Sequence, residues 1–324
     1  MKVSILGSGA YGLALATEIY ENKHEIIMWT PFEEEKNKLE TTRTNPSLGP
    51  ITIPDEVLFT TDIQKATEDT ELIIIALPAP FVDGVLRNAK EYISENTHIC
   101  IATKGIEKKT GFFINEIVEN NITTNKLAVI SGPTFAIDLA TKTTSGLSLA
   151  TKNEETKYIV KAALQNSHLR LRTTSDIIGV EICGAIKNVI AIASGILEGL
   201  GSSESTRAML LTEALSDIKK IITLFGGLES TILTYAGFGD LLLTCCSTKS
   251  RNFSFGKIIG ERNSKEKIDE YLSQYTVEGY NTLQSIYDLL KAKNISIPII
   301  DLIYNIVIKY GNPYELLTFL VEKD

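Results

Sequence analysis

Seven short β-like runs rich in isoleucine, valine and leucine occur in the first 175 residues, and helical stretches separate several of them. Runs this apolar are typical of strands buried on both faces of a sheet, and their alternation with helices is typical of parallel strands. The pattern therefore predicts a mostly parallel sheet flanked by helices. The runs are KVSILG, HEIIMW, ELIIIALP, HICIATKG, KLAVISGP, SGLSLAT and HLRLRTT.

From Asp176 onward the β signal fades, and every long apolar stretch has helical periodicity. Thr173–Ser175 has the composition of a junction, and Asp176 is a candidate N-cap for the first long helix. A chain of 324 residues suits two domains better than one. We therefore expect an α/β domain at residues 1–176 and an all-α domain at residues 177–324.

The net charge of −8 makes nucleic acid and anionic membrane unexpected partners, because such a surface repels both. Any anionic ligand must then be held by a local group of lysine, arginine and backbone N–H. The N-terminal sequence meets a glycine at position 7, so no signal-peptide core is expected. The cysteines lack zinc-type spacing and are typical of reduced thiols in a cytoplasmic protein without a metal site; they are Cys100, Cys183, Cys245 and Cys246.

Residues 177–197 form an apolar run long enough to span a membrane, yet Glu181, Lys187 and Asn188 lie in its middle. A single lysine at the centre of a membrane helix costs about 2.5–3.5 kcal/mol on the insertion scale. We therefore expect this run to be a buried helix of a soluble protein.

The first β-like run leads into GSGAYG, which has the spacing G-x-G-x-x-G at Gly7, Gly9 and Gly12. In dinucleotide-binding folds the first glycine permits a tight turn, and the second lets a pyrophosphate approach the backbone. The third lets the helix pack closely on the strand. This motif in a strand–turn–helix context predicts a Rossmann-like domain; the alternative is a glycine-rich turn without a ligand.

The end of the second β-like run bears on which dinucleotide is bound. NAD sites often carry an acid there and NADP sites an arginine, whereas here Trp29-Thr30 is followed by PFEEEK. No arginine lies near to accept a 2′-phosphate, and Glu33–Glu35 would oppose one, so NAD is favoured over NADP. Alternatively, these glutamates are the solvated start of a helix, where the dipole favours acids.

Two further strand ends carry polar groups. Lys104 lies just beyond the run HICIAT, where open α/β sheets hold their ligands, although it could equally be a surface lysine. The sequence SGPTFA offers the backbone of Gly132 and the hydroxyl of Thr134, with a simple tight turn as the alternative.

Lys187 lies on a helical stripe of small and polar residues, opposite a broad apolar side. Small residues leave room into which the amine and the amide of Asn188 reach, so we expect a ligand cleft; the alternative is that Lys187 extends to the domain edge. The other stripe members are Gly184, Ala191, Ser194 and Gly195.

The segment GFGDLLLTCCSTKSRN contains a second polar group. Asp240 and Thr244 are four residues apart and share a helix face, where Asp240 either orients Lys187 or binds a substrate hydroxyl. Ser250-Arg251-Asn252 begins another helical stretch, a favourable place for a phosphate. N-capping by Asp240 and Ser250 is an alternative that is compatible with both roles.

Seven motifs, in order, resemble those of the soluble bacterial-type NAD(P)-dependent glycerol-3-phosphate dehydrogenase family, and the resemblance extends from residue 1 to the C-terminus. It implies reversible hydride transfer between NAD(P)H and dihydroxyacetone phosphate, giving sn-glycerol 3-phosphate for glycerophospholipid biosynthesis, and it implies a homodimer. The motifs are GSGAYG, ATKGIE, SGPTFA, GAIKNVIAIASG, GFGDLLLT, SRN and VEGY.

The resemblance also implies roles for single residues. Lys187 matches the proton donor and acceptor, and Lys104 matches a second catalytic lysine near the substrate and the nicotinamide. The expected substrate contacts are Lys104, Gly132, Thr134, Lys187, Asn188, Asp240, Thr244, Ser250, Arg251 and Asn252. The expected cofactor contacts are Gly7, Gly9, Ala10, Tyr11, Gly12, Lys104, Ala136, Arg251, Val277 and Glu278.

Some positions depart from the family pattern, and two rival functions remain open. Pro31 and Phe32 replace basic residues that often follow the tryptophan, while Ser205 and Glu213 replace an asparagine and an arginine. The first rival is another two-domain dehydrogenase, of the hydroxyacid, ketopantoate or 6-phosphogluconate type. The second is a non-catalytic dinucleotide sensor on the same fold.

Overall fold

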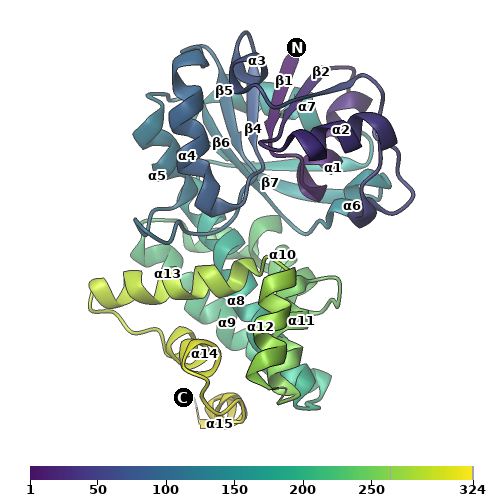
Figure 1. Cartoon of the computed structure of the whole chain (residues 1–324). Helices are drawn as coiled ribbons and strands as arrows, with labels where there is room; N and C mark the ends of the chain where they lie inside the picture. Colours follow the sequence, from purple (N-terminus) through teal and green to yellow (C-terminus); the bar gives the residue numbers. More distant parts are fainter. Residues whose placement is uncertain (263, 323–324) are drawn as a thin grey trace. The chain divides into compact units, whose positions relative to one another are not determined.

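The computed structural model describes residues 1–262 and 264–322, and the chain divides into two compact units (Figure 1). The first unit comprises Met1–Thr103 and Ile114–Ile177, and the second comprises Lys104–Phe113 and Ile178–Asp324. The segment Lys104–Phe113 thus belongs with the helical unit, which corrects the predicted boundary that put residues 1–176 in the first domain. It is held there by contacts such as the hydrogen bond from Ser285 Oγ to the carbonyl of Ile106, at 3.4 Å.

The first unit is built on one eight-stranded sheet with the order β3-β2-β1-β4-β5-β6-β7-β8. All neighbouring pairs are parallel except β6 and β7, so the predicted mostly parallel α/β fold is confirmed. The strands are β1 (Lys2–Leu6), β2 (Glu25–Trp29), β3 (Val57–Thr60), β4 (Leu72–Ile75), β5 (His98–Ile101), β6 (Leu127–Ser131), β7 (Ser145–Thr151) and β8 (Leu169–Thr174).

Among the strands of the described residues, β3 is the one that was not predicted from the sequence. It is only four residues long and lies at the edge of the sheet, with the side chain of Leu58 exposed. By contrast, β4 is LIII, and all four of its residues are fully buried. An edge strand is buried on fewer sides, so it lacks the continuous apolar run by which the central strands were recognised.

The helices of the first unit form two groups, and Figure 1 shows them on the two sides of the sheet. Helix α1 contacts α6 and α7, whereas α4 contacts α3 and α5. The elements are α1 (Ala10–Glu21), α2 (Glu33–Thr42), η1 (Pro46–Leu48), α3 (Ile63–Thr67), α4 (Ala79–Ala89), η2 (Lys90–Tyr92), α5 (Ile114–Asn121), α6 (Ala136–Ala140) and α7 (Glu154–Leu164).

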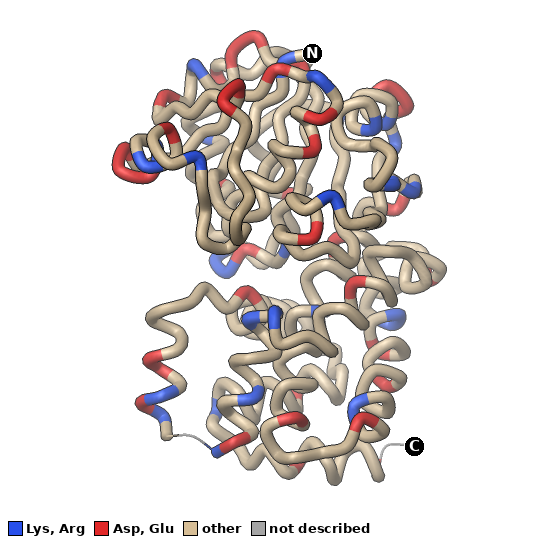
Figure 2. The backbone as a smooth tube through the Cα atoms, turned by 90° about the vertical axis from the view of Figure 1, so that its right-hand side faces the viewer, with Lys and Arg blue, Asp and Glu red and all other residues tan. Residues whose placement is uncertain are grey.

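The second unit is helical apart from its short N-terminal segment, as predicted for the C-terminal half. In Figure 2 acidic and basic residues are interspersed along the backbone of each unit. The elements are α8 (Ile177–Gly199), α9 (Glu204–Leu224), η3 (Glu229–Leu233), η4 (Tyr235–Gly239), α10 (Asp240–Cys245), α11 (Arg251–Gly260), α12 (Lys265–Gln274), α13 (Glu278–Ala292), α14 (Pro298–Ile308) and α15 (Glu315–Glu322).

Helix α8 is the core of the second unit. Its length and hydropathy would suffice for a membrane span, but 89% of its apolar window is buried within the protein. Burial extends from Gly179 to Leu197 without interruption and includes Lys187 and Asn188. A helix that is apolar on nearly all sides is typical of a core helix.

Helices α8 and α11 cross in very close contact at glycines. A Cβ atom at Gly195 would overlap the carbonyl of Phe253, and one at Gly256 would overlap the carbonyl of Ile192. Gly195 therefore serves helix packing, and the expectation that it leaves room for a ligand was wrong at this end of the stripe. Spacing alone does not distinguish a small residue beside a cleft from one beneath a neighbouring helix.

Candidate active site

The side chain of Lys187 is anchored by a buried carboxylate. Lys187 is only 8% exposed, and its Nζ donates to Oδ1 of Asp240 at 2.5 Å and to Oγ1 of Thr244 at 3.0 Å. Thr244 in turn donates to the same carboxylate oxygen at 3.3 Å. Lys187 is thus held in the interior by partners, and the alternative that it extends to the edge of the unit is not what the structure shows.

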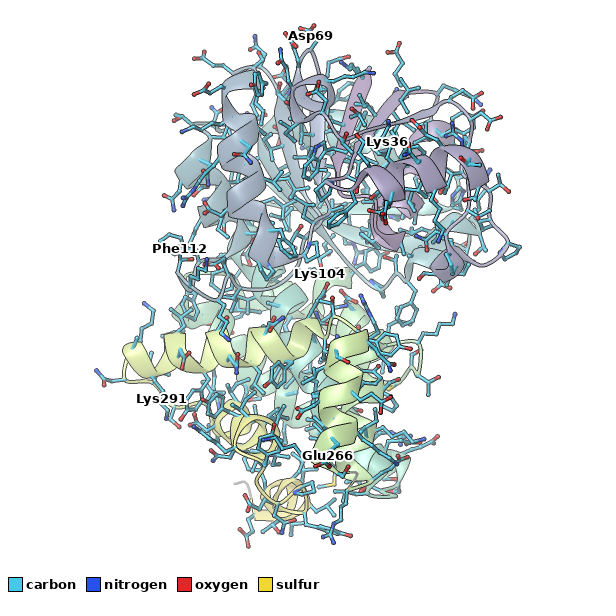
Figure 3. All side chains as sticks on the ribbon, viewed as in Figure 1. Lys36, Asp69, Lys104, Phe112, Glu266 and Lys291 are labelled. Atoms are coloured by element: carbon cyan, nitrogen blue, oxygen red, sulfur yellow. The ribbon has the colours of Figure 1, made fainter. Side chains whose placement is uncertain are left out.

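Lys104, which is labelled in Figure 3, binds the second oxygen of the same carboxylate, with Nζ 2.8 Å from Oδ2 of Asp240. Its side chain is 15% exposed, whereas that of Asp240 is 1% exposed. One buried carboxylate therefore bridges two ammonium groups, both within the second unit.

Asp240 reaches this position through an irregular turn. The residues Tyr235–Gly239 form a π-type turn in which Gly237 leaves helical geometry, with ψ −108°. A Cβ atom on Gly237 would overlap the carbonyl of Ile232, so this turn requires glycine. Asp240 is then the first residue of α10, after the N-cap Gly239, and Thr244 follows one turn later on the same face.

Burial and neighbouring charges act in opposite directions on the pKa of Asp240, and both affect the pKa of Lys187. Burial lowers the pKa of Lys187 to about 8, against the attraction of Asp240, while repulsion from Lys104 adds to the decrease. Burial raises the pKa of Asp240, but the two ammonium groups outweigh it and leave that pKa below its ordinary value. Near neutral pH the cluster therefore holds an ionised Asp240 and a lysine close to its titration point.

A chain of hydrogen bonds joins three helices beside Lys187. Asn252 Nδ2 donates to Oδ1 of Asn188 at 3.0 Å, and Asn188 Nδ2 donates to Oε2 of Glu278 at 3.1 Å. The backbone N–H of Gly279 donates to Oδ1 of Asn252 at 2.8 Å. Gly279 was missed in the sequence analysis, although it lies in the motif VEGY; a Cβ there would lie 2.9 Å from Oδ1 of Asn252.

The start of α11 carries a guanidinium group, that of Arg251, next in sequence to Asn252 of this hydrogen-bond network. Arg251 is its first residue and is exposed, and Ser250 is buried as the N-cap, accepting the N–H of Phe253 at 3.3 Å. Capping by Ser250 is thereby confirmed. Val277 is likewise the N-cap of α13, whose first residue is Glu278.

In the first unit the fingerprint has the geometry of a phosphate-binding turn. Gly7 has φ +117°, and a Cβ there would lie 2.7 Å from the carbonyl oxygen of Ala76. A Cβ at Gly12 would overlap the carbonyl of Gly7, whereas one at Gly9 would meet no described atom within 4 Å. Space is therefore left at Gly9, where a dinucleotide pyrophosphate approaches the backbone in such folds.

Helix α1 begins at Ala10, after the N-cap Gly9, and no described side chain caps it. Its first turn contains no acidic residue, so its N-terminus is suited to phosphate. Tyr11, in that turn, lies with its hydroxyl 3.2 Å from Oγ1 of Thr134. This contact joins the fingerprint helix to the segment SGPTFA.

Gly132 and Ala136 lie on either side of Thr134. A Cβ at Gly132 would lie 2.6 Å from the carbonyl oxygen of Gly146, so close packing against β7 explains the glycine. Thr134 is buried, its N–H donates to the carbonyl of Gly132 at 2.8 Å, and Ala136 is the first residue of α6.

The predicted site residues thus fall into two groups. The first unit brings together the fingerprint, Tyr11 and Thr134, and the second brings together the two lysines around Asp240 and the amide chain. The predicted glutamates Glu33, Glu34 and Glu35 form the first turn of α2, which confirms that they begin a helix.

Two family models together match most of the chain. The N-terminal model of NAD-dependent glycerol-3-phosphate dehydrogenase matches residues 2–157, and the C-terminal model matches residues 176–318. A relative from Thermoanaerobacter sp. (strain X514), named glycerol-3-phosphate dehydrogenase (NAD(P)+), is 33% identical over 324 residues. That match covers 100% of this chain and 98% of the relative.

Solved structures give the same result at the level of the fold. The crystal structure of glycerol-3-phosphate dehydrogenase from Coxiella burnetii has a TM-score of 0.93 and 28% identity, covering 99% of each chain. A structure of D-mandelate dehydrogenase has a TM-score of 0.66 over 98% of this chain but only 14% identity, so it shows a shared fold alone.

Proposed function

We propose that the chain, which belongs to the NAD-dependent glycerol-3-phosphate dehydrogenase family, catalyses reversible reduction of dihydroxyacetone phosphate to sn-glycerol 3-phosphate with NAD(P)H. The observation that carries this proposal is the pair of lysines on one buried carboxylate, Lys187 and Lys104 on Asp240. Reduction of a ketone creates an alkoxide, which requires a proton and nearby positive charge. The two ammonium groups provide both.

Lys187 is the proposed proton donor in reduction and proton acceptor in oxidation. A pKa of about 8 makes both directions accessible at physiological pH, because donor and acceptor forms are then both populated. Asp240 keeps the amine of Lys187 in place, and Lys104 adds the positive charge that the alkoxide needs. Thr244 restricts the amine further by accepting its hydrogen bond.

The first unit fits a dinucleotide, because its fingerprint leaves space at Gly9 and its α1 N-terminus is available to phosphate. A bound NAD(P)H would supply the hydride to the substrate C2. We assign Gly7, Gly9, Ala10, Tyr11 and Gly12 to the phosphates of the dinucleotide. The other assigned cofactor contacts are Lys104, Ala136, Arg251, Val277 and Glu278.

We assign the phosphate of the substrate to Arg251 and the start of α11. Arg251 is an exposed guanidinium at a helix N-terminus, which together suit a phosphate dianion. Asn252 donates a hydrogen bond to Asn188, so we expect these two residues to position Lys187 and Arg251 as well as to approach the substrate. Gly132 and Thr134 remain proposed substrate contacts.

We also propose a homodimer that works in the cytoplasm and supplies glycerol phosphate for phospholipid synthesis. Membership of the family supports all three proposals. Size-exclusion chromatography coupled to light scattering measures the oligomeric state. A monomer at micromolar concentration would contradict the proposed dimer without affecting the proposed reaction.

The reaction is tested by offering the purified protein NADH with dihydroxyacetone phosphate, a 2-keto acid and ketopantoate. We expect oxidation of NADH with dihydroxyacetone phosphate only. Turnover of another ketone without dihydroxyacetone phosphate would refute the proposed reaction and favour the hydroxyacid or ketopantoate type.

Substitution of Lys187 separates the enzyme from a non-catalytic sensor. We expect Lys187→Ala to fold, to bind NADH with little change, and to lose nearly all turnover. Near-normal kcat in this variant would show that Lys187 does not transfer the proton.

A further inference from the structure

We propose that Glu35, fixed by Thr30 at the carboxyl end of β2, makes the protein select NAD(H) over NADP(H). This selection rests on the proposed use of a dinucleotide by the first unit. Family membership does not decide it, because relatives are named for NAD(P)+.

Thr30 is next to the fingerprint in space. Strands β1 and β2 pair in parallel with Leu6 opposite Trp29, and the N–H of Gly7 donates to the carbonyl of Trp29 at 2.9 Å. Thr30, the first residue after β2, therefore lies beside Gly7, the first residue after β1. In dinucleotide-binding folds an acid at this end of the second strand binds the 2′-hydroxyl of the adenosine ribose.

Here the strand end supplies a hydroxyl instead of an acid, and the acid comes from the following helix. Thr30 is fully buried, and its Oγ1 donates to Oε2 of Glu35 at 2.6 Å. Glu35 belongs to the first turn of α2 and is half-buried. The bond to Thr30 uses one carboxylate oxygen, so the other is suited to accept a hydrogen bond from a ribose hydroxyl.

A second glutamate adds to the negative charge at the neighbouring strand end. Glu33 accepts a hydrogen bond from Thr61, which directly follows β3, and this bond lowers the pKa of Glu33. The carbonyl of Thr61 accepts from Nε1 of Trp29 at 3.1 Å, which ties the two strand ends together. A 2′-phosphate placed here would meet the carboxylates of both Glu33 and Glu35.

Two cations of α2 and its C-cap, Lys36 and Arg43, already have partners. Lys36, labelled in Figure 3, lies with Nζ 3.5 Å from Oε2 of Glu33. Arg43, at the other end of α2, donates from Nη1 to the carbonyl of Val57 at 2.8 Å, at the start of β3. Charge at the carboxyl ends of β2 and β3 therefore favours a ribose hydroxyl over a 2′-phosphate.

The test is a pair of dissociation constants, for NADH and for NADPH, measured by the fluorescence of Trp29. This is the chain's single tryptophan, and it lies directly before Thr30. We expect the wild-type protein to bind NADH at least tenfold more tightly than NADPH. Glu35→Gln should reduce this ratio about tenfold, and Thr30→Val should reduce it in the same direction, because each removes part of the proposed contact.

Glu34→Gln is the matched control, because it removes the same charge from the same helical turn at an exposed position. We expect it to retain the wild-type ratio within about twofold. The proposal is overturned if Glu35→Gln retains that ratio, if Glu34→Gln reduces it equally, or if the wild type binds NADPH as tightly as NADH. Failure to reduce dihydroxyacetone phosphate, with the NADH preference intact, would refute the proposed reaction and leave the selectivity standing.

Discussion

The Nζ atom of Lys187 lies 2.5 Å from one carboxylate oxygen of Asp240, and the other oxygen of that carboxylate is bound by Lys104 at 2.8 Å. Two ammonium groups and one carboxylate leave the buried cluster with one excess positive charge. Loss of one proton from Lys187 makes the cluster neutral and keeps Asp240 paired with Lys104. The cluster is therefore built to release and regain a proton without leaving an isolated buried charge.

The lowered pKa of Lys187 predicts opposite pH profiles for the two directions of the reaction. Oxidation of glycerol 3-phosphate needs the neutral amine, so kcat/KM should rise as pH increases through about 8. Reduction needs the ammonium form and should fall over the same interval. Initial rates from pH 6.5 to 9.5 measure both profiles, and two parallel profiles would contradict the proposed role.

The same shift predicts a pH dependence of stability. The pKa of Lys187 is lower in the folded chain than its ordinary value of 10.5, so between about 8 and 10.5 the unfolded chain holds more protons. The contribution of Lys187 to the free energy of unfolding therefore increases with pH across this window and is least favourable below it. Urea unfolding of wild type and Lys187→Met at pH 7.5 and 9.5 measures the change; a difference that does not become more favourable to wild type at high pH would contradict it.

Removal of the shared carboxylate should destabilise the second unit more than removal of Lys187. Asp240→Asn leaves two facing ammonium groups without a counter-charge, which costs about 3–5 kcal/mol for buried pairs. Lys187→Met leaves the Asp240–Lys104 pair intact and removes a buried charge, so its cost should be clearly smaller. Chemical denaturation at pH 7 compares the two variants, and greater stability of Asp240→Asn would exclude this account.

Much of the site could be predicted from the sequence because its groups lie at short spacings on single elements. The fingerprint glycines lie within six residues, and Asp240 and Thr244 lie four apart on one helix, as the structure shows them. Capping by Ser250 follows from local chemistry in the same way.

What the sequence did not reveal depends on contacts between distant segments. Lys104 meets Asp240 across 136 positions, because residues 104–113 pack with the helical unit. The glycine at 195 was interpreted as space for a ligand, since only the position of α11 shows that a helix occupies it. The hydrogen bond from Thr30 to Glu35 joins residues close in sequence. Its bearing on dinucleotide binding becomes clear only when the pairing of β1 with β2 places Thr30 beside the fingerprint.

Two alanine substitutions in the fingerprint should have opposite consequences. Gly12→Ala places a Cβ on the carbonyl of Gly7 and should cost about 1–3 kcal/mol of stability. Gly9→Ala meets no described atom and has φ −65°, which alanine adopts readily, so stability should be unchanged. We expect it instead to weaken NADH binding at least tenfold, because the Cβ occupies the proposed pyrophosphate position. Thermal unfolding and Trp29 fluorescence measure both, and unchanged NADH affinity in Gly9→Ala would contradict phosphate binding there.

Gly195→Ala should disturb the proposed active site by pushing α8 and α11 apart. Its Cβ would overlap the carbonyl of Phe253 and lie 2.9 Å from the N of Lys257, so α8 and α11 must separate, at a cost of about 1–3 kcal/mol. Because Asn252 at the start of α11 donates to Asn188 on α8, we expect KM for the substrate to rise.

Gly84→Ala provides the control for this variant. Gly84 is an exposed residue inside α4, and a Cβ there meets no described atom within 4 Å, so the substitution should stabilise the first unit by roughly 0.5–1 kcal/mol. Denaturation curves and steady-state kinetics on both variants give the comparison. If Gly195→Ala were as stable as wild type with an unchanged KM, the close crossing of α8 and α11 would not be what holds Asn188 and Asn252 together.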